Sequence, residues 1–362
     1  MLSLSDLPPE ILSEIATFVG GEYLRDQTER LLLCKAWYRA AHHLAFENVI
    51  IDIGPLERCL AESHFPDSLV GTKSLFIRGK PFHKTLRSYN KLMAAKMECI
   101  AGRNHNRKGA EMYLRRWWTI NMCNLLTSFA KYLPQMADLR SFRVKVPIGS
   151  LTSERLDSLR CAATVSLISH LPKTLTSLTI DTPGGPSRFK PQMAQSNHVC
   201  PLLLNKEVLP SLRHLAIRSH NICPELCAVD DSRLQTQLQT LIVNLSMAEG
   251  GFYAAVNSRY CEEDKYERKP IYPHMKTLAK SVAHRFPAIT MMRLLCINPK
   301  SPGSLGICYN VLSEREVLLP DDVLWDDVDW DDTDAEPAPP PSEHSDPDDS
   351  NIEASYDGSL SP

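Results

Sequence analysis

Histidine and cysteine gather in one part of the chain, and these are the side chains best suited to hold a metal. Zinc in proteins is bound by thiolate sulfur and imidazole nitrogen, usually four such groups. The spacing here is irregular, because no C-x-x-C pair is present and Pro224 lies between the two closest cysteines. Cysteine also serves widely as a small buried apolar residue. We therefore expect no metal site and keep zinc as the alternative, which a metal assay of the purified protein decides. The cluster comprises His198, Cys200, His214, His220, Cys223 and Cys227.

Motifs that signal catalysis are missing from the sequence. The phosphate-binding pattern G-x-x-x-x-G-K-S/T, the dinucleotide pattern G-x-G-x-x-G, the G-x-S-x-G nucleophile turn and the zinc-protease pattern H-E-x-x-H do not occur. Each pattern supplies a local geometry that its reaction needs. We expect a protein that is not an enzyme and has neither catalytic residues nor a cofactor. An enzyme would need a pocket with converging titratable groups, which a sequence alone does not display.

The charge is divided between a basic body and an acidic tail. Residues 321–362 contain fifteen Asp or Glu and no Lys or Arg, whereas residues 1–320 contain forty basic and twenty-eight acidic residues, a net of +12. The tail also holds Trp325 and Trp330 among its aspartates. We hypothesise that this Trp-containing piece docks on the basic body and competes with a substrate. A solubilising tail with incidental tryptophans is the alternative, and disorder is expected for the Pro-, Ser- and Asp-rich remainder.

Basic and aromatic residues are interleaved in residues 78–118, a mixture that could serve single-stranded nucleic acid. Lysine and arginine would contact phosphates while aromatic rings stack on bases. The basic residues are spread over a loop and a helix, however, which is typical of a solvated face, and Trp118 lies on the apolar side of that helix. We therefore prefer an acidic protein segment as the partner of the basic body, and nucleic acid is the less favoured alternative.

One short phrase recurs along the body and predicts strands that alternate with helices. Each copy has a Leu-Pro or Phe-Pro pair, a few polar residues, and a strand of alternating apolar positions. The proline ends a helix and directs the chain into the strand. Helices are expected at residues 107–133, 152–171 and 272–286. The predicted strands are Ser74–Ile77, Leu139–Val144, Leu175–Ile180, Leu212–Ile217, Leu238–Val243 (without the proline) and Arg293–Ile297, preceded by an extended segment at Asn48–Ile53.

This recurrence resembles a degenerate leucine-rich-repeat array. The resemblance implies an irregular α/β solenoid with parallel strands over residues 50–319, whose concave face binds partners. Regular repeats carry an Asn or Cys after their leucines, and Asn244 and Asn298 match that position here. An ordinary α/β domain with a parallel sheet is the alternative. In the solenoid, the outward face of the sheet would carry Ser177, Thr179, Arg213, Thr240 and Arg293.

The first fifty residues predict two helices that are too small to form a stable core easily. Ser5 or Asp6 is expected to cap the first helix, with Pro8 and Pro9 in its first turn. The pair Gly20–Gly21 then ends that helix. Apolar residues recur at helical spacing in both helices, at Ile11, Leu12, Ile15 and Val19 in the first and at Leu31–Trp37, Ala40, Ala41 and Leu44 in the second.

Residues 1–49 resemble an F-box. The resemblance is carried by Leu7-Pro8, Glu10-Ile11-Leu12, Ile15, Leu33-Cys34-Lys35 and Trp37. Members of that family bind a Skp-type adaptor, which links them to a cullin-based ubiquitin ligase. The segment from Gly20 to Gln27 is longer than the common pattern, which leaves the register of Leu24 open. The resemblance implies adaptor-binding residues, some of them internal to the helical pair, at Leu7, Pro8, Pro9, Ile11, Leu12, Ile15, Leu33, Cys34 and Trp37.

Together the two resemblances imply a substrate receptor of an SCF-type ubiquitin ligase, of a kind frequent among fungal F-box proteins. The expected organisation is an F-box at 1–49, a repeat domain for an unknown protein substrate at 50–319, and a disordered acidic tail at 320–362. A leucine-rich-repeat scaffold that binds the adaptor without delivering a substrate is the alternative. The sequence lacks an eighteen-residue apolar stretch and a signal sequence, so we expect a cytoplasmic or nuclear protein with reduced cysteines and no membrane contact.

Overall fold

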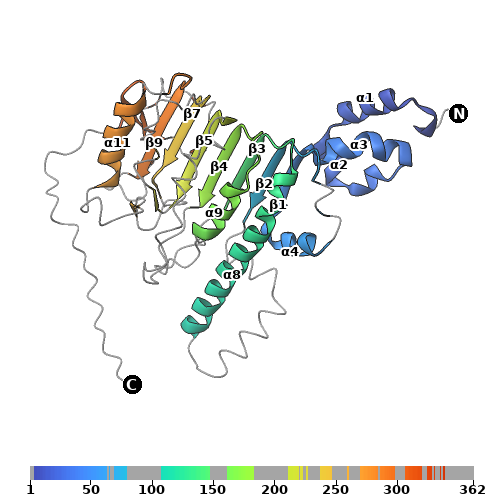
Figure 1. Cartoon of the computed structure of the whole chain (residues 1–362), viewed down its shortest axis with the longest axis horizontal. Helices are drawn as coiled ribbons and strands as arrows, with labels where there is room; N and C mark the ends of the chain where they lie inside the picture. Colours follow the sequence, from blue (N-terminus) through green and yellow to red (C-terminus); the bar gives the residue numbers. More distant parts are fainter. Residues whose placement is uncertain are drawn as a thin grey trace.

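The computed structural model shows a mixed α/β protein built around one sheet of nine strands (Figure 1). Seven strands run parallel in the order in which they occur in the chain, and an antiparallel hairpin completes the sheet. Two short strands form a second, parallel sheet. The structure describes residues 4–62, 65, 69–79, 107–146, 161–182, 211–219, 221–222, 226, 237–246, 259–260, 270–283, 286–297, 306–319, 324–327, 330, 335 and 337–338.

The chain begins with a helical unit whose elements are η1 (Leu4–Asp6), α1 (Pro9–Val19), α2 (Gly21–Asp26), η2 (Thr28–Leu31) and α3 (Lys35–Glu47). The expected cap of the first helix is wrong, because Ser5 and Asp6 lie in a separate 3-10 turn and Pro8 precedes α1 without a side-chain cap. The second helix starts later than predicted, at Lys35. Cys34 is extended there, and its Sγ accepts a hydrogen bond from the backbone N–H of Trp37 at 3.4 Å.

Two adjacent glycines connect α1 to α2. Gly20 has a φ of 85°, a conformation that favours glycine, and its N–H donates to the carbonyl of Ala16 at 3.0 Å to close α1. Gly21 lies so close to α3 that a Cβ there would be 2.2 Å from the backbone oxygen of Leu44. The segment after Gly20, which is longer than in the common F-box pattern, forms the helix α2, and Leu24 in that helix is buried.

Replacing Gly21 by alanine is expected to destabilise the helical unit, although alanine normally favours helix. The added methyl group must push α2 away from the backbone of α3. Gly20→Ala is expected to be the milder change, because a Cβ there meets nothing and the cost is that of placing alanine at φ 85° and ψ 142°, a region nearly restricted to glycine, about 1–3 kcal/mol. Chemical denaturation of both variants measures the difference. Equal midpoints, or a Gly21→Ala variant as stable as the wild type, would contradict the close approach.

Every strand that the sequence predicts is confirmed, and the main sheet is wider than predicted. The sequence pattern misses the hairpin because its two strands lack the preceding Leu-Pro phrase. The two short strands of the second sheet were also not predicted. The predicted strands correspond to β1 (Asn48–Asp52), β2 (Ser74–Arg78), β3 (Ser141–Lys145), β4 (Ser177–Thr182), β5 (His214–Ser219), β7 (Thr240–Asn244) and β9 (Met291–Ile297). The additional strands are β6 (Asn221–Ile222), β8 (Arg259–Tyr260), β10 (Gly306–Asn310) and β11 (Arg315–Leu318).

Within the described residues, the helices of the body follow the predicted positions, with one addition. The long predicted helix is α8 (Arg107–Ala130), followed by the turn η3 (Leu133–Gln135), and the last is α11 (Ile271–Val282). The helix predicted at 152–171 is seen as α9 (Cys161–Ser169), and residues 152–160 lie outside the described part. The addition is α4 (Ile53–Ala61), which was not predicted because Gly54 and Pro55 in its first turn are typical of a loop.

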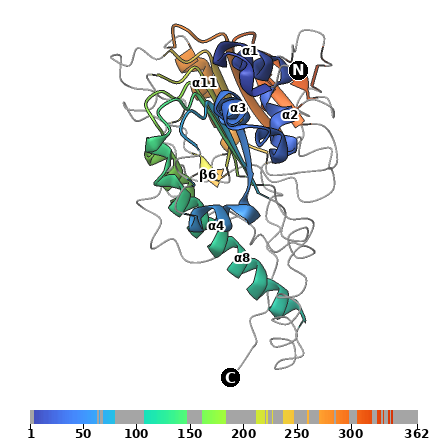
Figure 2. The ribbon, with the colours of Figure 1, turned by 90° about the vertical axis from the view of Figure 1, so that its right-hand side faces the viewer.

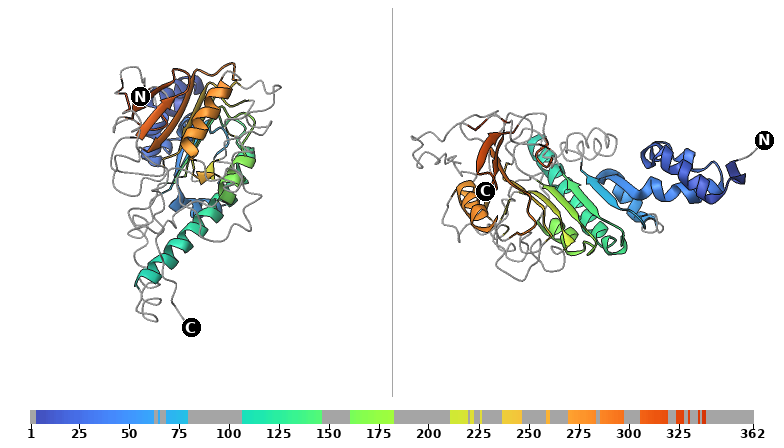
Figure 3. Two further views of the ribbon diagram at one scale, coloured as in Figure 1. Left: turned by 90° about the vertical axis from the view of Figure 1, so that its left-hand side faces the viewer. Right: turned by 90° about the horizontal axis from the view of Figure 1, so that it is seen from above.

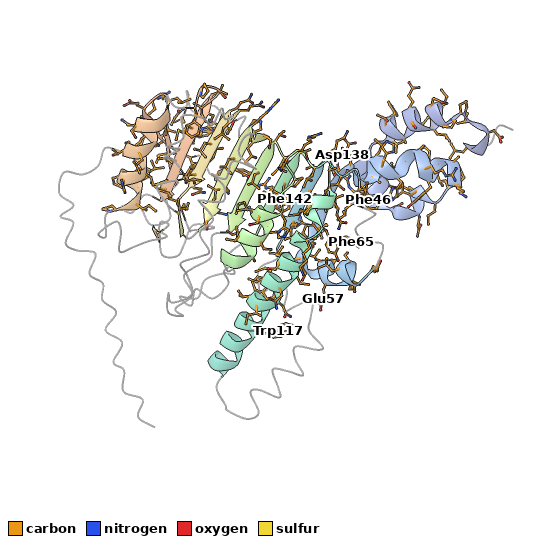
Figure 4. The ribbon with its side chains drawn as sticks, viewed as in Figure 1. Phe46, Glu57, Phe65, Trp117, Asp138 and Phe142 are labelled. Atoms are coloured by element: carbon orange, nitrogen blue, oxygen red, sulfur yellow. The ribbon has the colours of Figure 1, made fainter. Side chains whose placement is uncertain are left out.

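Strand register places one set of alternate residues in a core beneath the helices. These positions are almost all aliphatic, and they form one hydrophobic core with buried residues of α8 such as Met122 and Phe129. Phe142 belongs to this set and lies on β3, close to α8 in Figure 4. The two buried rows are Leu75, Phe142, Leu178, Leu215, Leu241 and Met292, and Ile77, Val144, Ile180, Ile217, Val243 and Leu294.

The helical unit and the sheet have separate hydrophobic cores. The unit projects from the β1 end of the sheet, whereas α11 lies at the other end (Figure 1, and Figure 3, right). Figure 2 shows the molecule from the side of the helical unit. At the junction, the Thr72 hydroxyl donates to the carbonyl of Phe46 at 3.0 Å, and the Lys73 N–H donates to the carbonyl of Glu47 at 2.8 Å. Phe46 is labelled at this junction in Figure 4. A change inside the helical core should therefore leave the sheet intact.

Helix α11 holds the antiparallel hairpin against the sheet. The Tyr272 hydroxyl donates to the carboxylate of Glu316 at 2.7 Å, and the Lys276 ammonium reaches the same oxygen. Lys280 pairs with Glu314 at 2.6 Å. Partial burial opposes ionisation of Glu316, but the hydrogen bonds from Lys276 and Tyr272 outweigh it and keep the pKa of Glu316 below its usual value. The carboxylate is thus ionised at neutral pH and fixes β11 to α11.

Candidate functional site

The face of the sheet opposite the helices is polar and charged at β3 to β5. Because side chains alternate along a strand, the residues between the buried rows share this face. Five of them, Arg143, Lys145, Asp181, Arg218 and Arg293, are called the charged face below. The two central rows are Phe76, Arg143, Thr179, Ala216, Ile242 and Arg293, and Asp52, Arg78, Lys145, Asp181, Arg218 and Asn244.

A buried ion pair lies at the centre of the charged face. The Arg218 guanidinium donates from Nε to Asp181 Oδ1 at 2.6 Å and from Nη2 to Oδ2 at 3.0 Å. Lys145 Nζ lies 3.6 Å from the same carboxylate, which is fully buried. Removing charges from water is costly, so such a pair is tolerated only when hydrogen bonds satisfy both partners. The two-point geometry of Arg218 supplies those bonds.

The acidic tail covers this ion pair. The indole Nε1–H of Trp325 donates to Asp181 Oδ2 at 3.3 Å, and its ring centroid is 5.6 Å from the Arg218 guanidinium carbon. The next residue, Asp326, places its carboxylate 2.7 Å from Nη2 of Arg143. Trp325 therefore contacts both members of the pair, and Asp326 adds an ionic contact one strand further.

Arg293 holds the tail at a second point. Its Nη1 donates to the carbonyl of Asp327 at 3.0 Å, its Nη2 donates to the carbonyl of Trp330, and its guanidinium carbon lies 4.8 Å from the Trp330 ring centroid. Further along, Ala338 N–H donates to the carbonyl of Glu316 on β11 at 2.9 Å. The tail thus contacts strands from β3 to β11.

Apolar packing accompanies these polar contacts. Buried residues of the same sheet face form a small cluster of their own, against which three tail residues pack. Docking of the Trp-containing piece on the basic body, which the charge division predicted, is confirmed, and competition with a substrate stays a prediction. The described tail residues have defined contacts in place of the disorder expected from residue 320 onward, and residues 339–362 lie outside the described part. The cluster comprises Ala216, Ile242, Leu295, Cys308 and Val317, with Trp325, Trp330 and Ala335 from the tail.

The predicted adaptor-binding residues divide into a buried and an exposed group. Leu12 and Trp37 are 0% and 4% exposed, so they support the surface of the helical unit and do not form it. The Trp37 indole donates to the carbonyl of Arg30 at 2.7 Å inside the unit. Leu7, Ile15 and Cys34 are half-buried around the same core, whereas Pro8, Pro9, Ile11 and Leu33 are exposed.

Two strongly exposed apolar residues of this unit were not predicted. Phe18 is 94% exposed and Leu32 is 72% exposed, next to Leu33 at 64%. Phe18 follows Ile11 by seven residues on α1, and this helical spacing was the available signal. The start of α1, which carries Ile11, and the segment before α3, which carries Leu32 and Leu33, both lie at the end of the unit far from the sheet (Figure 1), whereas Phe18 lies at the other end of α1. Several large apolar side chains on so small a unit are typical of a contact surface.

The metal cluster and the basic segment lie mostly outside the described residues. Of the proposed ligands, His214 lies on β5 with its Nδ1 3.1 Å from the Thr240 hydroxyl, and the other five fall outside the described part. Within the described ranges, no three His, Cys, Asp or Glu side chains gather as metal ligands would. Trp118 is buried, as expected, while residues 80–106 of the basic segment are not described.

Comparison of the chain with protein-family models, with curated proteins and with solved structures finds no match. Within the part of the chain that the structure describes, no helix combines the length and the apolar character needed to cross a membrane.

Proposed function

We propose that the protein is a non-catalytic substrate receptor of an SCF-type ubiquitin ligase. The helical unit would bind a Skp-type adaptor and, through it, a cullin, while the sheet domain would bind a protein substrate. The observation that carries the proposal is the helical unit itself. It has its own core around Leu12 and Trp37 and nevertheless exposes Phe18, Leu32 and Leu33 to solvent.

The arrangement of the sheet supports the second half of the proposal. Parallel strands that follow one another in chain order, with helices packed on one face, are what a leucine-rich-repeat-like solenoid would have. In such a solenoid, the face without helices would be the concave binding surface. Its basic side chains suit an acidic partner, and it lies away from the end of the helical unit that would bind the adaptor, so neither partner would block the other (Figure 1).

The test is co-purification of tagged full-length protein with a Skp-type adaptor, beside a variant carrying Leu32→Glu and Leu33→Glu. Burying an exposed leucine contributes about 1.5–3 kcal/mol, so charging both positions should weaken the adaptor complex by roughly a hundredfold or more. Both side chains are exposed, so the melting temperature of the variant should remain that of the wild type.

Val70→Glu is the matched control. Val70 is 65% exposed, like Leu33, but it precedes β2 in the sheet domain, so this change should leave adaptor binding unaltered. Adaptor that binds the double variant as well as the wild type would contradict the assignment of the surface. Adaptor binding without stabilisation of any cellular protein on removal of the chain would favour the scaffold alternative.

A further inference from the structure

We propose that the charged face recognises an acidic peptide segment with tryptophan directly before aspartate, and that residues 324–327 and 330 of the tail occupy this face as an internal competitor. The inference deepens the proposed function, because it assigns such a segment to the protein substrate. It commits to one partner chemistry, an extended acidic segment of a second protein. A tail segment of this chemistry is already seated on the face.

The contacts of Trp325 favour tryptophan over phenylalanine. Its ring lies near the Arg218 guanidinium, an attraction that phenylalanine or tyrosine would share. Its indole N–H also donates to Asp181, which no phenylalanine can do. Asp181 is held by Arg218 and lies near Lys145, so the acceptor for this N–H is fixed in place before any ligand arrives.

The contact of Asp326 selects a carboxylate at the following position. Arg143 Nη2 meets this carboxylate at 2.7 Å, and the Arg143 guanidinium carbon lies 5.0 Å from the Phe76 ring centroid. The ring limits where the guanidinium can lie, so the position of the ligand carboxylate is limited too. Together, Arg218, Asp181 and Arg143 recognise two consecutive side chains.

The tail repeats the same three residues. Trp325-Asp326-Asp327 and Trp330-Asp331-Asp332 are identical triplets separated by five positions. The first tryptophan lies near Arg218, and the second lies over Arg293 on β9. Two tryptophans, each near an arginine of the same face, indicate a repeated mode of recognition.

The charged face has binding capacity that the described tail residues do not use. It carries four cationic side chains and one carboxylate, a net of +3, whereas among the described tail residues the carboxylate of Asp326 forms an ion pair with it and Asp327 contacts it through its backbone carbonyl. The buried Nε atoms of Arg143 and Arg293 have no acceptor among the described residues. A foreign segment that places an oxygen at either Nε would gain a hydrogen bond over the internal one. Such a ligand can displace the tethered segment despite the high effective concentration of the tether.

The experiment measures binding of a fluorescent peptide with the sequence of residues 320–333 to the purified full-length chain, without adaptor. The wild-type chain should bind weakly, because its own segment occupies the face. A chain with Trp325→Ala and Asp326→Asn should bind the peptide at least tenfold more tightly, with affinity falling as salt rises. Adding Arg143→Gln to that chain should weaken binding at least tenfold, because a charge-assisted hydrogen bond is lost.

Two matched controls test the chemistry. A peptide with phenylalanine in place of the first tryptophan keeps the ring and loses the N–H, and it should bind several-fold more weakly. Arg140→Gln removes an exposed arginine that precedes β3 and donates to the carbonyl of Thr174, and it should change nothing. Equal binding by the wild-type and tail-substituted chains, indifference to Arg143→Gln, or binding of single-stranded oligonucleotide in place of the peptide would overturn the proposal.

A second measurement applies if the tail-substituted chain does not fold. Hydrogen exchange of the wild-type chain is then followed at the Asp327 amide, which donates to the carbonyl of Leu324 at 3.0 Å. The peptide of residues 320–333 is added at millimolar concentration in a form whose mass differs from that of the chain's own segment, so that the two can be told apart. It should accelerate exchange at Asp327 as the internal segment is displaced, and an unchanged exchange rate would contradict displacement. The adaptor takes no part in the peptide experiment. Absence of peptide binding would therefore not contradict adaptor binding by the helical unit, and absence of adaptor binding would not contradict peptide binding by the charged face.

Discussion

Asp181→Ala is expected to lower the free energy of unfolding by about 3–5 kcal/mol, the range for breaking a buried ion pair by removing one partner. The variant leaves the Arg218 guanidinium, which is 6% exposed, without its two-point acceptor. It also brings Arg218 and Lys145 together with no carboxylate between them and removes the acceptor of the Trp325 indole. Urea denaturation with a tryptophan signal measures the loss.

A double variant provides the control for this prediction. Asp181→Leu with Arg218→Met replaces the pair by apolar residues of similar size, which is often neutral or stabilising for buried ion pairs. We therefore expect it to recover most of the stability that Asp181→Ala loses. It should not recover peptide binding, since recognition of tryptophan needs the Asp181 acceptor. Stability equal to wild type in Asp181→Ala would mean that the pair contributes little to the fold.

Trp37→Ala is expected to unfold the helical unit while the sheet remains folded. Truncating a buried tryptophan costs about 3–5 kcal/mol, a large share of the stability of so small a unit. The change also removes the indole hydrogen bond to the Arg30 carbonyl. Because the two hydrophobic cores are separate, the loss should stay within residues 4–47. Hydrogen exchange by mass spectrometry should show fast exchange there and unchanged protection in β3 to β9.

Tyr38→Ala is the control beside it. Tyr38 follows Trp37 on α3 but is 40% exposed, so its truncation should cost far less and leave protection of the unit unchanged. Adaptor binding should be lost in Trp37→Ala through unfolding, in contrast to Leu32→Glu with Leu33→Glu, where the fold remains. Uniform loss of protection across the whole chain would show that the two cores unfold together.

The strands were predictable from sequence because their signal is local. A Leu-Pro or Phe-Pro pair precedes most of the strands, and alternating apolar residues such as Leu178 and Ile180 then define the strand and its buried side. The start of α3 was misplaced because Leu31, Leu32 and Leu33 continue the apolar pattern although the helix begins only after Cys34. Hydrophobicity alone does not reveal an extended residue that accepts a capping hydrogen bond.

The charged face could be predicted only in part. Thr179 and Arg293 were expected on the outward side of the sheet, and the structure places them there. Arg143, Asp181 and Arg218 were not recognised, because their association depends on the register of three strands far apart in sequence. Docking of the tail on the body was predicted from the division of charge. Its partners could not be predicted, because they come together only through the register of these strands.

The most direct test of the central claim is size-exclusion chromatography of the purified full-length chain mixed with a purified Skp-type adaptor and cullin. We expect one complex with equal amounts of the three proteins, absent when the chain carries Leu32→Glu and Leu33→Glu. A wild-type chain that elutes alone under these conditions would contradict the assignment of the helical unit and, with it, the proposed ligase function.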